Sequence, residues 1–127
     1  MNNHEFIKMF EDELSTYTGA PYVVLTDSCT NAVFLMLKYL DIQTTISIPN
    51  HTYISIPQQI IHAGGCVEWN TEEWIGSYNL KNTPIWDSAV GFHKDMYIKD
   101  QFMCLSFQQK KALPIGKGGA IERNQTN

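Results

Sequence analysis

The chain has 127 residues, of which 43% are hydrophobic, 12% aromatic and 17% charged, as in a soluble globular domain and not a disordered one. Thirteen acidic and nine basic side chains give a formal net charge of −4, which does not favour nucleic acid or an anionic membrane as a partner. No apolar stretch is long enough to span a bilayer, and no signal peptide is recognisable. We therefore expect one cytoplasmic domain over residues 1–127.

The hydrophobic pattern predicts helices and strands in alternation. Apolar side chains at helical spacing predict helices over 4–18, 31–40 and 52–62, and a turn of helix is expected within 88–94. Short apolar runs predict strands over 22–25, 45–48, 66–69, 84–86, 102–105 and 119–122, and the polar stretch 70–82 is expected to be a loop. This order predicts an α/β fold with a mostly parallel sheet and helices on both of its faces.

The three cysteines match neither a zinc site nor a disulfide framework in their spacing. Cys29, Cys66 and Cys104 each lie in or beside an apolar run, so we expect buried, reduced thiols. Reduced thiols are consistent with a cytoplasmic protein, and no metal site is expected.

Polar side chains follow several of the predicted strands at the point where each strand ends. Residues 27–30 follow the first strand, 51–53 the second, Asp87 the fourth and Ser106 the fifth. In sheets with parallel strands, ligands bind outside the carboxyl ends of the strands. We therefore expect these residues to meet at one edge of the sheet.

The segment from Ser106 to Gly119 has the local layout of a lysine that holds pyridoxal phosphate (PLP). Lys111 stands five residues after the strand-end Ser106 and before a glycine-rich strand, and its neighbour Lys110 is the alternative. Glycines here allow the backbone to approach closely. A solvated surface lysine pair would explain the same residues without a ligand.

Two further residues can serve the ring of PLP. Asp87 can keep the ring nitrogen protonated, although it could equally cap a helical turn beginning at Ser88. Tyr53 can lie on the ring, with His51 as its substitute, although Tyr53 could also be an ordinary core aromatic.

The phosphate of PLP needs hydroxyls and backbone amides, ideally at the N-terminus of a helix. Ser28, Thr30 and the amides of Cys29 to Asn31 can supply them, and Ser106 can donate a further hydroxyl. A plain helix cap explains Ser28 equally well, and Ser106 could simply end its strand.

Five segments, taken in order, give the chain a resemblance to the DegT/DnrJ/EryC1/StrS family of PLP-dependent sugar aminotransferases. Residues 10–14 resemble the family's opening helix, 25–32 its phosphate turn, 49–53 its Pro-x-x-Thr-aromatic segment, 86–89 its Glu-Asp-Ala-Ala segment, and 106–119 its lysine segment. The last match is the most specific of the five.

The resemblance implies a reduced version of the large domain of type I PLP-dependent transferases. It assigns the Schiff-base lysine to Lys111, the ring-nitrogen partner to Asp87 and the stacking residue to Tyr53. The resemblance also assigns the phosphate contacts, by position, to Thr30, Asn31 and Ser106. The family moves an amino group from a donor such as L-glutamate or glutamine to a keto-sugar nucleotide, and it acts as a homodimer.

Four departures from the family pattern bear on activity. Val90 stands where the family has Gln or His near the cofactor, and Cys29 replaces a glycine of the phosphate turn. Between Asn79 and Pro84 the family has further helices and a strand, and the chain ends just after the glycine-rich strand. We therefore expect a truncated domain without the family's C-terminal small domain. A PLP-binding or interaction module without transaminase turnover is the alternative to an aminotransferase.

Overall fold

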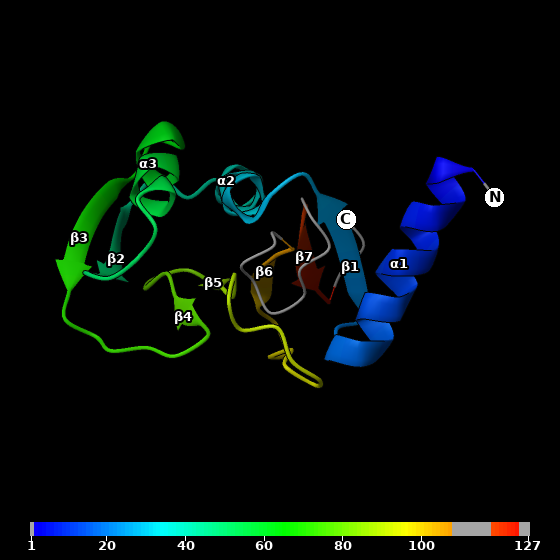
Figure 1. Cartoon of the computed structure of the whole chain (residues 1–127). Coiled ribbons are helices and arrows are strands. Elements are labelled where there is room, and N and C mark those ends of the chain that lie inside the picture. The colour runs from blue at the N-terminus through cyan, green and yellow to red at the C-terminus, as the bar shows by residue number, and fades with distance from the viewer. Residues whose placement is uncertain (1, 108–117, 125–127) are drawn as a thin grey trace.

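The computed structural model describes residues 2–107 and 118–124 (Figure 1). Three helices and seven strands follow one another in the described chain. They are, in order, α1 (Asn3–Thr18), β1 (Tyr22–Thr26), α2 (Cys29–Tyr39), β2 (Thr45–Pro49), α3 (Ser55–His62), β3 (Cys66–Asn70), β4 (Tyr78–Asn79), β5 (Ile85–Asp87), β6 (Phe102–Ser106) and β7 (Gly119–Arg123). The predicted α/β class is confirmed, and each of the three long predicted helices is present.

The strands form two sheets, called below the two parts of the sheet, and the larger has strands of mixed direction. One part has the order β1-β7-β6-β5-β4 and the other pairs β2 with β3. β5 is parallel to β6 and β2 to β3, whereas β7 runs antiparallel to both β1 and β6. Because β1 and β6 both oppose β7, they run in the same direction as each other and as β5. The carboxyl ends of β1, β5 and β6 therefore lie at one edge, as the sequence predicted.

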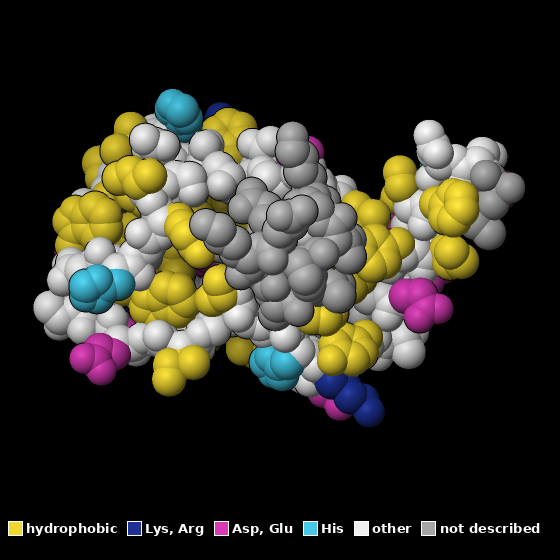
Figure 2. Space-filling model, in the orientation of Figure 1, with side chains coloured by type: hydrophobic (Ala, Val, Ile, Leu, Met, Phe, Trp, Pro, Cys, Tyr) yellow, Lys and Arg dark blue, Asp and Glu magenta, His cyan; other side chains and the backbone are white. Residues whose placement is uncertain are grey.

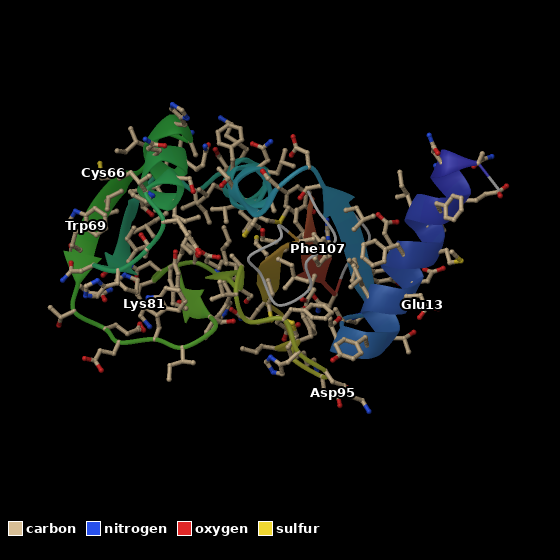
Figure 3. The ribbon with its side chains drawn as sticks, viewed as in Figure 1. Glu13, Cys66, Trp69, Lys81, Asp95 and Phe107 are labelled. Atoms are coloured by element: carbon tan, nitrogen blue, oxygen red, sulfur yellow. The ribbon has the colours of Figure 1, made fainter. Side chains whose placement is uncertain are left out.

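The segment 70–82, predicted to be a loop, contains a short strand. β4 pairs antiparallel with β5, and just beyond it the amide of Lys81 donates a 3.0 Å hydrogen bond to the carbonyl of Ser47 in β2. This isolated bridge joins the two parts of the sheet, and Figure 3 shows Lys81 between β4 and the β2–β3 pair. The helical turn expected within 88–94 is absent from these described residues, which form turns.

Helices cover both faces of the sheet. On one face α2 and α3 lie over a core that includes Val33, Leu37, Ile46 and Ile60. On the other face α1 contributes Leu14 to a second core with Leu105, Phe107 and others. Figure 1 shows α1 at the β1 end of the molecule and α3 with β2 and β3 at the opposite end.

Helix boundaries follow from local chemistry. The side chain of Asn2 accepts a hydrogen bond from the amide of Glu5 and so caps α1, which ends at Gly19 with a φ of 84°.

The first residues of α1 stand out from the body of the molecule and carry exposed apolar side chains, among them Phe6, Ile7 and Met9 (Figure 2). None of the helices in the described ranges has the length and apolarity that a membrane crossing requires.

The expectation of three buried thiols is wrong for Cys66. Cys29 and Cys104 are buried and free, whereas Cys66 is free and exposed. Cys66 begins β3, which lies at the end of the strand order (Figure 3). Its side chain shares a sheet face with Glu68 and Thr45, which are also exposed, so this face of β3 is not covered by the described residues.

Candidate functional site

A cavity of about 210 Å³ lies where the carboxyl ends of β5 and β6 meet the N-terminus of α2. It is called the site cavity below. Its lining combines hydroxyls, one carboxylate and apolar groups, and consists of Ser28, Cys29, Thr30, Tyr53, Ile54, Ser55, Ile56, Asp87, Ala89 and Ser106. Six of the eight predicted site residues are thus brought together, from four separate segments of the chain.

The predicted phosphate turn forms the start of α2. Ser28 caps this helix, because its Oγ accepts a 3.1 Å hydrogen bond from the amide of Asn31. The hydroxyl of Thr30 donates to that of Ser55 at 3.1 Å, which ties the start of α2 to the start of α3. The first amides of α2 point to the end of the helix at which Ser28 lies, where an anion is stabilised.

Gly119 allows this turn to lie directly on the sheet. A Cβ at position 119 would come within 2.5 Å of the carbonyl carbon of Ser28 and 2.6 Å of the amide nitrogen of Cys29. It would also lie 2.7 Å from the carbonyl oxygen of Leu105. Only a residue without a side chain permits this approach, so the glycine fixes how closely the turn sits against β6 and β7.

Asp87 is held by three donors on the floor of the cavity. Its side chain is 2% exposed, and its Oδ2 accepts a 2.7 Å hydrogen bond from the hydroxyl of Tyr78. Its Oδ1 accepts the amide of Ala89 at 3.0 Å and the thiol of Cys29 at 3.6 Å. The amide contact is the turn-capping role that the sequence left open, and it coexists with a place in the cavity.

Tyr78 was not predicted as part of the site. Burial raises the pKa of its phenol well above the usual range, and the neighbouring Asp87 carboxylate raises it further, so the phenol remains a hydrogen-bond donor at any ordinary pH. The indole of Trp74 lies against its ring, with centroids 4.7 Å apart. Tyr78 stands in a stretch whose composition indicated a loop, so its burial had no signal in the sequence.

Tyr53 and His51 lie on different surfaces. Tyr53 lines the site cavity with 52% of its surface exposed, so the interpretation of it as a core aromatic is wrong. His51 is exposed and lines a separate groove with Glu72, Glu73 and Trp74. Tyr53 is therefore better placed than His51 to lie against a ligand in the cavity.

Three predicted residues, Asn31 and the two lysines, are not among those that the structure places around the site cavity. Asn31 is exposed, and its side-chain amide donates to Asp27 at 2.7 Å, outside the cavity lining. Lys110 and Lys111 lie outside the described residues. The chain on either side is fixed beside the cavity, because the amide of Phe107, next to Ser106, donates to the carbonyl of Gly118 at 2.9 Å.

The described lining fits the ring and phosphate of PLP in its donor set. A buried carboxylate suits a protonated ring nitrogen, and hydroxyls at a helix N-terminus suit a phosphate. Asp87 supplies the carboxylate, Tyr53 an exposed aromatic face, and Ser28, Thr30 and Ser106 the hydroxyls.

The model of the DegT/DnrJ/EryC1/StrS aminotransferase family matches residues 1–70. That match covers β1, the turn at the start of α2, and the segment that carries Tyr53. No curated protein matches the chain at a significant level.

Solved structures share the fold of this chain. The PLP form of Spr1654 from Streptococcus pneumoniae superposes with a TM-score of 0.76 at 18% identity, over 94% of this chain and 46% of that one. DesI, solved in the presence of its TDP-sugar product, gives 0.74 at 15% identity, over 98% and 42%. NtdA from Bacillus subtilis, with bound PMP, gives 0.71 at 19% identity, over 95% and 37%. The chain thus spans less than half the length of these structures.

Proposed function

Because the chain belongs to the DegT/DnrJ/EryC1/StrS aminotransferase family, we propose that the site cavity binds pyridoxal phosphate, the family's cofactor, for the transfer of an amino group. The observation that carries the proposal is the buried Asp87 carboxylate, which faces a cavity bordered by a helix N-terminus. When bound, the cofactor ring takes up electrons that are released as an amino group moves.

Several residues of the cavity have a proposed part in binding. Asp87 holds the proton of the ring nitrogen, and Tyr53 covers one side of the ring. Ser28, Thr30 and Ser106, with the first amides of α2, hold the phosphate, and Cys29 contributes its backbone amide. The predicted contribution of Asn31 is not proposed, because its amide already donates to Ser28. The described lining contains no basic side chain. The positive end of the dipole of α2 is therefore the proposed source of positive charge for the phosphate.

Lys111 is the proposed point of covalent attachment, with Lys110 as the alternative. The hydrogen bond between Phe107 and Gly118 supports this assignment, because it fixes both ends of the connecting segment next to Ser106 of the cavity. Lys111 stands five positions after Ser106, and the chain covers at most roughly 3.5 Å per residue, so the lysine must stay near the cavity.

The proposed substrates are an amino donor such as L-glutamate and a keto-sugar nucleotide acceptor, with a homodimer as the working form. The family supports this proposal, as does the TDP-sugar product present with DesI. A cytoplasmic location is also proposed, because Cys29 and Cys104 are free thiols and thiols stay reduced in the cytosol.

The attachment is tested by incubating the protein with PLP, reducing it with borohydride and mapping the modified peptide by mass spectrometry. We expect one adduct, on Lys111, which is lost in Lys111→Ala and retained in the matched control Lys110→Ala. Asp87→Asn should weaken PLP binding at least about tenfold, because it removes the charge that pairs with the ring nitrogen. Failure of both lysines to acquire an adduct would contradict the proposal.

A second candidate is a PLP-binding module without transaminase turnover. Val90, which is exposed at the turn that follows Asp87, favours it, because a valine has no polar group with which to hydrogen-bond a cofactor. Addition of L-glutamate to the PLP-loaded protein decides between the two. Bleaching of the visible absorbance indicates amino transfer, whereas a band that persists with a wide range of donors indicates a binding module.

A further inference from the structure

Tyr78 is the closest hydrogen-bond donor to the carboxylate on the floor of the site cavity. It belongs to β4, the short strand beside β5, and only 1% of its surface is exposed. Its hydroxyl lies 2.7 Å from Oδ2 of Asp87, compared with 3.0 Å from the amide of Ala89 to Oδ1. Such short bonds to an ionised acceptor are the stronger kind.

The contacts of Asp87 leave little acceptor capacity open. A carboxylate offers about four lone-pair positions. On Oδ1 both are engaged, one by the amide of Ala89 and one, more weakly, by the thiol of Cys29. On Oδ2 the hydroxyl of Tyr78 takes one. Any donor that enters the cavity and approaches Asp87 must therefore share Oδ2 with Tyr78.

Tyr78 is fixed in place by its own neighbours. The ring of Trp74 lies 4.7 Å from its ring at an angle of 54°. The indole nitrogen of Trp74 in turn donates to the carbonyl of His51 at 2.9 Å. Tyr78 thus connects Asp87 to the segment that presents Tyr53.

We propose that Tyr78 is a positioning residue that sets how firmly Asp87 holds the proton on the ring nitrogen of the cofactor. This inference rests on the proposed function of the site cavity. By donating to Oδ2, Tyr78 orients the carboxylate and stabilises its charged form, which reduces its strength as an acceptor for a second donor. The ring nitrogen therefore binds its proton less tightly than it would beside an otherwise similar Asp87 without this contact.

Other titratable groups near Asp87 do not duplicate this role. Among the described residues, Cys29 of α2 and Cys104 of β6 are the thiols coupled to this carboxylate. Burial raises the pKa of Cys104 well above its usual range, so that thiol stays neutral. The Cys29 contact, at 3.6 Å, is longer than that of Tyr78 and comes from a weaker donor.

The test compares Tyr78→Phe with wild type and with the matched control Tyr97→Phe. The phenylalanine keeps the ring packed against Trp74 and removes only the hydroxyl. Tyr97 also donates a hydrogen bond, to the carbonyl of Gln101 at 2.8 Å, but is half-buried and packs against the core on the other sheet face. Each protein is loaded with PLP labelled with ¹⁵N in the ring, and the ring nitrogen is titrated by NMR.

We expect the ring nitrogen of Tyr78→Phe to bind its proton about tenfold more tightly than in wild type and in Tyr97→Phe. Equal titration curves in all three proteins would overturn the role of Tyr78. A second readout needs no cofactor, namely the ¹³C resonance of the Asp87 carboxyl carbon in the unloaded proteins at neutral pH. We expect it to move in Tyr78→Phe alone, and an unmoved resonance would refute the contact.

These two readouts separate the two proposals. If no protein binds PLP, the proposed function fails, while the carboxyl resonance still decides whether Tyr78 acts on Asp87. If PLP binds and neither readout changes, the proposed function stands and the inference about Tyr78 fails.

Discussion

Glu122 of β7 is a buried carboxyl group outside the site cavity. Its side chain is 0% exposed, and neither of its oxygens has a hydrogen-bond partner among the described residues. It pairs with Val23 on one side and Met103 on the other, so its surroundings are apolar. Burial raises the pKa of Glu122 to about 8, which keeps the group largely protonated at neutral pH.

This residue makes stability depend on pH. In the unfolded chain Glu122 ionises above about pH 4.3, whereas in the folded protein it stays neutral up to about pH 8. The free energy of unfolding is therefore highest at acid pH. It falls as pH rises towards 8, by roughly 3 kcal/mol between pH 5 and pH 8, because only the unfolded chain gains from ionising Glu122. Glu122→Gln should remove this slope, as measured by urea unfolding at several pH values.

The matched control is Glu13→Gln, a change at an exposed position of α1 (Figure 3). It should leave the pH dependence as in wild type. If Glu122→Gln lost stability with rising pH as steeply as wild type, Glu122 would not be the group responsible.

The sequence predicted the site residues at strand ends better than those that support them. Ser28, Asp87 and Ser106 could be placed because each polar residue ends an apolar run, and strand ends share an edge. Tyr78 and Glu122 could not, because their burial depends on segments distant along the chain. Glu122 is paired with β1, about a hundred residues earlier in sequence.

The cavity depends on how closely the start of α2 lies against β7. Gly119→Ala would place a methyl group within 3 Å of backbone atoms of Ser28, Cys29 and Leu105, which cannot rotate away. We expect a loss of about 1–3 kcal/mol in the free energy of unfolding, together with weaker PLP binding, because the turn must move. Thermal unfolding and a PLP titration measure the two effects.

Gly64→Ala serves as the comparison for that variant. Gly64 has a φ of 99°, so alanine is strained there, but the added atom would meet only the side chain of Gln43, at 3.4 Å. It should lower stability and leave PLP affinity unchanged. If both variants weakened PLP binding equally, the effect of Gly119→Ala would reflect stability and not the position of the turn.

Element positions were predicted more fully than strand directions. The pattern of apolar residues located each helix and six of the seven strands, because it reflects local burial. It did not show that β7 runs against β1 and β6, since direction is set by how the chain returns from β6. The two-residue β4 was missed because Tyr78–Asn79 is too short to give an alternating pattern.

The two parts of the sheet are unequally connected. β6 and β7 pair over four residues each, and β1 and β7 over five, whereas within residues 2–107 and 118–124 the only bridge from β2 to the larger part is that of Ser47 to Lys81. We expect amides of β2 and β3 to exchange with solvent at least about tenfold faster than those of β6.

Hydrogen exchange followed by NMR or mass spectrometry measures this difference directly. α2 and α3 pack together and share one core with both parts of the sheet, which works against independent opening. Equal protection of β3 and β6 would therefore mean that the helices, not the strand bridge, determine cooperativity, and the prediction would be wrong.

The bridge between Ser47 and Lys81 also marks where a protein of this kind can change in length. Lys81 and Asn82 are exposed, and Asn82 turns the chain with a φ of 74° before β5 begins. Extra residues inserted at this turn would emerge on the surface. Growth or shortening there leaves α2, β5 and β6 in place, so evolution can resize the scaffold while keeping its ligand-binding edge.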